Sequence, residues 1–137
     1  MESKKLKILL VDDNASFRKA VKLFLEKEYN HHIIGEASNG FEFLELIKMT
    51  DPDLVLMDIQ MPILDGITAT KKWCLHNPQT KVIAVTMFTD KIFLQQLIES
   101  GFKGCIYKTS FFSEIILAIV KICKGDLYFP KNIQIAK

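Results

Sequence analysis

The sequence predicts an α/β fold in which five parallel strands form one sheet with helices on both faces. Short apolar runs with strand character alternate five times with amphipathic, helix-forming segments. Several of these runs are uninterrupted, which is typical of strands buried on both faces of a parallel sheet. Because each connection between parallel strands has to carry a helix across the sheet, the alternation predicts a doubly wound arrangement.

The central strand of this sheet is expected to end in an aspartate. Four apolar residues, Leu54–Met57, run directly into Asp58, and Pro62 and Gly66 mark a loop after it. In open α/β sheets, ligands bind in the crevice outside the carboxyl ends of the strands. Asp58 is therefore placed for chemistry.

The remaining elements follow from periodicity and end signals. The other strands are expected at Lys7–Val11, His32–Ala37, Val82–Val85 and Gly104–Tyr107. The helices are expected at about residues 15–28, 39–49, 67–75, 90–99 and 113–124. Asn39 with Glu42 is typical of a capping box, and Asp90 and Ser113 are expected to cap the last two helices. Asp65 and Gly66 are expected to form a turn.

Composition limits the class of protein. A chain of 137 residues, with 49% hydrophobic and 25% charged residues, predicts one soluble domain. A net charge of +2 is too small to indicate a nucleic-acid or membrane surface, and no apolar run approaches the roughly twenty residues of a membrane span. Three cysteines without CxxC spacing predict reduced, packed thiols and a cytoplasmic location. His31, His32 and His76 lack metal-ligand spacing and are expected at the surface.

Polar residues follow four of the predicted strands. Asp12 and Asp13 follow the first strand, Asp58 ends the third, Thr86 ends the fourth and Lys108 follows the fifth. In a parallel sheet these ends lie at one edge. The sequence therefore predicts that three carboxylates, a hydroxyl and an ammonium group meet in one crevice.

Three neighbouring carboxylates call for a cation. Two of them about 4 Å apart, at an effective dielectric near 20, repel by about 4 kcal/mol, which raises one pKa by about three units. Mg²⁺ suits such a site, because it needs few carboxylates and keeps bound water. Lys108 would offset one further charge, and Asp58, which stands alone on the central strand, is the best candidate for a nucleophile toward a phosphoryl group.

With these residues in place, the chain resembles the receiver domain of bacterial two-component response regulators over essentially its whole length. The matching segments are Leu10–Asn14, Met57–Pro62 with Asp65 and Gly66, Val85–Thr86, and the Gly101–Gly104 lead-in to Lys108. The resemblance implies a flavodoxin-like (CheY-like) sheet of order 2-1-3-4-5. It also implies phosphorylation of Asp58 by a sensor histidine kinase, with Thr86 and Lys108 assisting, so that the protein is a switch and not an enzyme.

The resemblance further implies a Mg²⁺ site. Its ligands would be the side chains of Asp13 and Asp58 and the carbonyl of Gln60, with Asp12 acting mainly through bound water. Two positions depart from the family pattern. Cys105 stands at the usual aromatic switch position, three residues before the lysine, and Thr109 replaces the common proline after it. A small side chain at position 105 cannot be coupled to Thr86 in the way that a rotating ring is.

The domain is expected to span residues 1–125, with a tail or the start of an interdomain linker at residues 126–137. The tail resembles the junction that precedes a LuxR-type helix-turn-helix domain, so transcription control and DNA binding are expected only through an output domain outside these residues. The last two helices are apolar beyond one stripe, which indicates either deep burial or a patch that pairs two receivers after phosphorylation. The resemblance favours such a homodimer.

Two other functions are open. An aspartyl phosphatase of the haloacid-dehalogenase type needs an Asp-x-Asp motif, but Asp58 is followed by Ile59 and Gln60. A pseudo-receiver that binds partners without phosphate is the alternative that Cys105 keeps open.

Overall fold

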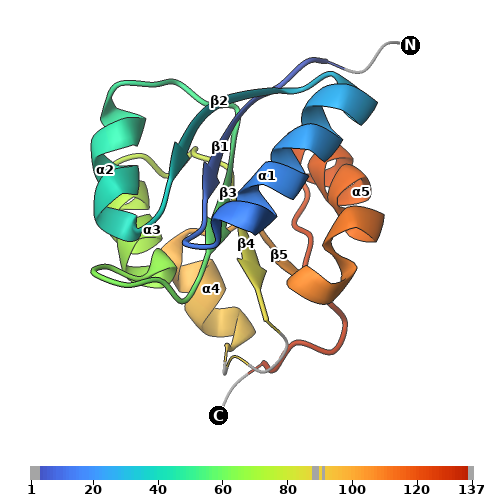
Figure 1. Cartoon of the computed structure of the whole chain (residues 1–137). Coiled ribbons are helices and arrows are strands. Elements are labelled where there is room, and N and C mark those ends of the chain that lie inside the picture. Colours follow the sequence, from blue (N-terminus) through green and yellow to red (C-terminus); the bar gives the residue numbers. More distant parts are fainter. Residues whose placement is uncertain (1–3, 88–89, 91, 136–137) are drawn as a thin grey trace.

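One parallel sheet forms the centre of the molecule (Figure 1). The computed structural model describes residues 4–87, 90 and 92–135. The strands are β1 (Lys7–Val11), β2 (His32–Ala37), β3 (Leu54–Asp58), β4 (Val82–Thr86) and β5 (Gly104–Tyr107). Their order is β2-β1-β3-β4-β5, and every neighbouring pair is parallel. The predicted fold class and strand order are confirmed.

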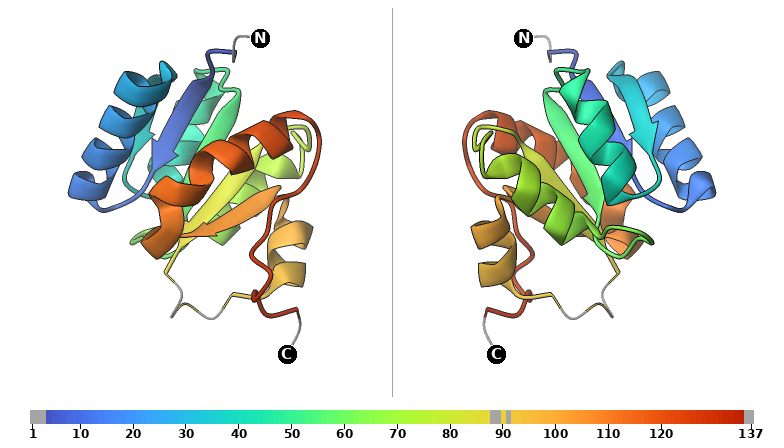
Figure 2. Two further views of the ribbon diagram at one scale, coloured as in Figure 1. Left: turned by 90° about the vertical axis from the view of Figure 1, so that its right-hand side faces the viewer. Right: turned by 90° about the vertical axis from the view of Figure 1, so that its left-hand side faces the viewer.

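Helices cover both faces of this sheet, α1 and α5 on one side and α2, α3 and α4 on the other (Figure 2). They are α1 (Ala15–Leu23) with its continuation η1 (Phe24–Glu28), α2 (Gly40–Lys48), α3 (Gly66–Cys74), α4 (Leu94–Ser100), and α5 (Phe111–Cys123), which follows the short turn η2 (Lys108–Ser110). The last turn of the predicted first helix is a π-helix.

The strands supply two apolar cores, one under each helical layer. In β1, Ile8 and Leu10 pack under α1 and α5, whereas Leu9 and Val11 pack under α2, α3 and α4. Successive strand side chains point to opposite faces, so a strand covered on both sides is apolar at every position. This explains the uninterrupted apolar runs in the sequence.

The predicted cap of α2 is confirmed. Asn39 Oδ1 accepts a hydrogen bond from the Glu42 amide at 2.9 Å. The Glu42 carboxylate reaches back to Ser38, accepting from its amide and its hydroxyl at 2.8 Å each. The first bond satisfies a donor that the first turn of a helix leaves free, and the other two tie the residue before the cap to that turn.

Two other predicted caps are wrong. Helix α4 begins at Leu94 after Phe93, with no side-chain cap, and the Asp90 carboxylate accepts from Thr86 and Met87 instead. Helix α5 begins at Phe111, because η2 leads directly into it, so Ser113 lies inside the first turn. Its hydroxyl donates to the Ser110 carbonyl at 3.0 Å.

One histidine and one cysteine differ from the expectation. His31 is buried, its Nδ1 accepts a hydrogen bond from the Leu6 amide at 3.1 Å, and burial lowers its pKa. Among the cysteines, all free thiols, Cys74 and Cys105 are buried, as expected, but Cys123 is exposed. No helix in the described part of the chain is long and apolar enough to cross a membrane.

The segment after α5 returns along the edge of the sheet. Tyr128 pairs with Gly104 of β5, and its carbonyl accepts from the Cys105 amide at 2.8 Å. Further along, Ile133 is buried and the Gln134 carbonyl accepts from the first amide of α4. Residues 126–135 thus connect β5 with the start of α4.

Candidate functional site

Three aspartates meet at the carboxyl edge of the sheet. Asp12 and Asp13 follow β1, and Asp58 is the last residue of β3. One carboxylate oxygen of each lies within 4.8 Å of the others. Asp12 and Asp58 are buried, whereas Asp13 is exposed.

Lys108, the first residue after β5, points its ammonium group at these acids. Its Nζ lies 2.9 Å from Asp12 Oδ2 and 3.7 Å from Asp58 Oδ2. The same atom lies 4.9 Å from the centre of the Phe17 ring, in a cation–π contact. The Lys108 ammonium group is thus in contact with both an aromatic ring and the carboxylates.

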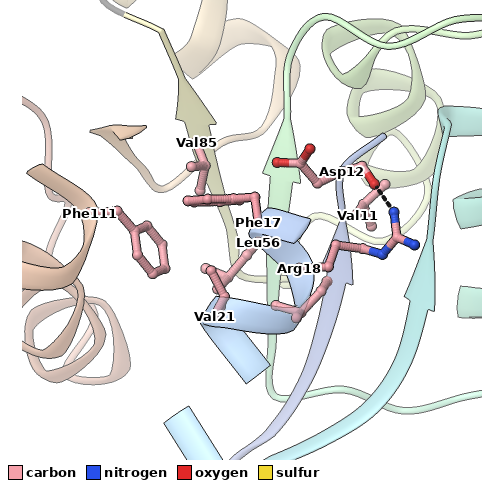
Figure 3. Close-up of a pocket in the computed structure, with 9 residues that line it drawn as sticks. Val11, Asp12, Phe17, Arg18, Val21, Leu56, Val85 and Phe111 are labelled. Carbon is pink, nitrogen blue, oxygen red and sulfur yellow. Dashed lines mark hydrogen bonds between the residues drawn. The ribbon is translucent and has the colours of Figure 1, made fainter. Parts of the chain in front are cut away.

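The end of β1 is held by two residues of the loop and helix that follow it. The Asn14 amide donates to Asp12 Oδ1 at 2.8 Å, and the Asn14 side chain caps α1. Arg18 donates to the backbone oxygen of Asp12 (Figure 3) and to Glu36 of β2 at 3.0 Å. Figure 3 also shows the apolar side chains under Asp12, which enclose a cavity of only about 10 Å³.

The backbone of the loop after β3 lies close to the backbone of Asp58. The Gly66 amide donates to the Ile59 carbonyl at 2.8 Å, and a Cβ at residue 66 would lie 2.0 Å from the Asp58 backbone oxygen. Only glycine fits there. Asp65, expected in a turn, caps α3 by accepting from the Thr68 amide at 2.8 Å.

The surroundings raise the pKa of both Asp58 and Lys108. Burial, followed by the charge of Asp12, raises the pKa of Asp58 to about 7, although Lys108 acts in the opposite direction. Repulsion between carboxylates, the cause that the sequence predicts, is therefore second to burial. Burial lowers the pKa of Lys108, but the bond to Asp12 and the three acidic charges outweigh it and raise that pKa above its ordinary value.

These residues fit a hard divalent cation. Asp12 Oδ2 is buried and, within the described residues, has no hydrogen bond of ordinary geometry, despite its short distance to Lys108. An open pocket of about 670 Å³ is lined by Asp13, Asp58 and Gln60. Carboxylate oxygens with space for water are the ligands that Mg²⁺ prefers.

Thr86 is buried at the end of β4, and its hydroxyl is directed to another acid. Its Oγ1 donates to Asp90 Oδ2 at 2.6 Å, and Asp90, not Thr86, lines the pocket with Asp58 and Lys108. Asp90 was predicted only as a helix cap, so its place beside Thr86 at the pocket was missed. An acid four residues after a strand-end hydroxyl is the only trace of it in the sequence.

A comparison with family models decides the relationship that this geometry indicates. The model of the response regulator receiver domain matches residues 8–120. The chain belongs to this family. As a receiver domain, it carries its three aspartates and its lysine at the strand ends described above.

Curated relatives of this receiver domain are regulatory proteins by name. The transcriptional regulatory protein LiaR of Bacillus subtilis (strain 168) is 38% identical over 121 residues, which are 88% of this chain and 57% of LiaR. The oxygen regulatory protein NreC of Staphylococcus aureus (strain JH9) is 32% identical over 124 residues, 90% of this chain and 57% of NreC. The receiver domain thus spans a little over half the length of these relatives.

Solved structures of other receivers have the same fold. A two-component response regulator of the LuxR family from Aurantimonas sp. SI85-9A1 superposes with a TM-score of 0.86 at 28% identity, covering 95% of this chain and 93% of that one. The response regulator domain of Thermotoga maritima CheB superposes with a TM-score of 0.74 at 26% identity, covering 89% and 96%.

Proposed function

We propose that this receiver domain is a switch that is activated when Asp58 takes a phosphoryl group from a sensor histidine kinase in a Mg²⁺-dependent reaction. The observation that carries the proposal is the grouping of the Asp58 carboxylate with Asp12, Asp13 and the Lys108 ammonium. A lone buried carboxylate would remain protonated near neutral pH, but one beside a cation and a lysine is available as a nucleophile.

Each residue has a role in the transfer. A carboxylate oxygen of Asp58 attacks the phosphorus, and the bond from phosphorus to the kinase histidine breaks, with the nitrogen keeping the electron pair. The product is an acyl phosphate on Asp58. Lys108 offsets the negative charge on the transferring oxygens.

The metal would be held by the side chains of Asp13 and Asp58 and by the Gln60 carbonyl, with Asp12 contributing through water. When bound, Mg²⁺ would supply positive charge to the phosphoryl oxygens. The Thr86 hydroxyl would then donate a hydrogen bond to one of those oxygens. This grouping favours a phosphoryl acceptor over the haloacid-dehalogenase alternative, whose Asp-x-Asp motif is missing around Asp58.

The output belongs to the same proposal. The curated relatives described above are longer than this chain by roughly half, and LiaR is a transcriptional regulatory protein by name, so we propose that the receiver acts in the cytoplasm on a DNA-binding output domain after residue 137. Residues 126–137 would begin the linker to it. Exposed apolar residues of α4 and α5 would pair two receivers after phosphorylation.

Intact-mass measurement tests the acceptor. After incubation with Mg²⁺ and acetyl phosphate, we expect one phosphoryl adduct per chain, no adduct in Asp58→Asn, and an unchanged adduct in the control Asp51→Asn, which alters an exposed aspartate. An equal adduct in Asp58→Asn would refute the assignment. Rapid turnover of a phosphoester would indicate the phosphatase, and no adduct in the wild-type chain would indicate the pseudo-receiver.

A further inference from the structure

We infer that Asp90 is a positioning residue that holds Thr86 in the unphosphorylated state and opposes phosphorylation of Asp58. The inference rests on the proposed function, because it concerns the step in which Thr86 turns to the phosphoryl group. It assigns a role to an acid that lies outside the Asp12, Asp13 and Asp58 cluster.

The geometry of the Thr86 hydroxyl is the first observation. Asp90 Oδ2 accepts from Thr86 Oγ1 at 2.6 Å and from the Met87 amide at 3.2 Å. A threonine hydroxyl carries a single proton to donate. Thr86 therefore cannot bond a phosphoryl oxygen while it donates to Asp90, and hydrogen bonds to a carboxylate are among the stronger ones.

The position of the Asp90 charge is the second observation. Asp90 lines the same pocket as Asp58, Asp13 and Lys108. A phosphoryl group on Asp58 would bring about two negative charges into that pocket, and Asp90 would repel them. Lys108 could offset this charge, but before phosphorylation its Nζ is paired with Asp12 Oδ2 at 2.9 Å.

The two bonds of Asp90 make the end of β4 a two-state element. Before phosphorylation, one carboxylate oxygen holds the Thr86 hydroxyl and the Met87 amide together. After phosphorylation, Thr86 donates to the phosphoryl group, and Asp90 loses one of its two donors. The buried Cys105 has no ring that could move with Thr86. Phosphorylation of Asp58 would therefore change the structure at residues 86, 87 and 90.

Phosphorylation rates of four full chains test this role. The wild type, Asp90→Ala, Thr86→Val and the double variant are incubated with acetyl phosphate and Mg²⁺, and the adduct is followed by intact mass. We expect Asp90→Ala to be phosphorylated about three- to tenfold faster, the gain expected when a charge-assisted bond that opposes the reaction is lost. Because this is a gain, a misfolded variant cannot imitate it.

The double variant isolates the contact with Thr86. Thr86→Val keeps the branched shape without the hydroxyl, so in that background we expect Asp90→Ala to give less than half of its gain. An unchanged rate in Asp90→Ala, or an equal gain in both backgrounds, would overturn the inference while leaving Asp58 as the acceptor. No adduct in the wild type would instead refute the proposed function itself.

Discussion

The buried carboxylate of Asp58 is the residue on which the electrostatics of the site depend. It is 5% exposed, and burial together with Asp12 raises its pKa from 3.8 to about 7. The folded chain therefore holds this proton more tightly than the unfolded chain does. The stability that this adds is present below about pH 4 and is lost as the pH rises to about 7.

Asp58→Asn should accordingly stabilise the metal-free protein at high pH. We expect the free energy of unfolding to rise by about 1–3 kcal/mol at pH 8 and by much less at pH 4. Urea denaturation at the two pH values measures it, with Asp51→Asn as the control. A gain that is equal at both pH values would contradict this explanation.

At the scale of residues, topology could be predicted but side-chain directions could not. The sequence predicts correctly that Asp12, Asp58 and Lys108 lie at one edge of the sheet, because the carboxyl ends of parallel strands lie at the same edge. The direction of the Thr86 hydroxyl could not be predicted, since it depends on where Asp90 lies in the folded chain. The burial of His31 depends on an amide 25 residues away.

Among the elements, strands were easier to predict than helix ends. The five strands agree with the prediction to within one residue, because each is a short run buried by helices on both faces. The starts of α4 and α5 were wrong, since Asp90 and Ser113 have competing partners and a cap is chosen by the loop geometry. The π-helical turn η1 has no signature in the apolar spacing.

The segment at residues 126–135 was predicted only as part of a tail or the start of a linker. Ile133 is 8% exposed and packs in the core beneath α4, whereas Ile135 is 71% exposed. We expect Ile133→Ala to lower the free energy of unfolding by about 2 kcal/mol, near the low end for a buried isoleucine because it lies near the chain end. Ile135→Ala is the matched control, and equal effects of both variants in urea denaturation would show that the segment adds nothing to stability.

At the scale of the whole molecule, the last two helices combine burial and exposure. Ile115, Ala118 and Ile122 of α5 are buried, but Leu117 and Val120 are 52% and 44% exposed. Deep burial thus describes one part of α5 and apolar exposure another, while the pairing of two receivers through the exposed part stays a prediction.

Sedimentation tests whether this surface joins two receivers. With Mg²⁺ and an acyl-phosphate mimic, we expect the wild-type chain to shift toward a dimer, whereas Asp58→Asn should not shift. Leu117→Glu should prevent the shift without affecting the phosphoryl adduct, because its side chain is on the surface. A wild-type chain that remains a monomer at high concentration would reject the dimer.

Asp58 is proposed to take the phosphoryl group in preference to every other aspartate of the chain. Borohydride reduces an aspartyl phosphate to homoserine, so reduction after treatment with acetyl phosphate and Mg²⁺, followed by peptide mapping by mass, identifies the acceptor. We predict homoserine at position 58 only, and none when Mg²⁺ is removed with a chelator. Homoserine at position 12 or 13 would contradict the assignment of Asp58 as the acceptor, and an equal yield without Mg²⁺ would contradict the need for the metal.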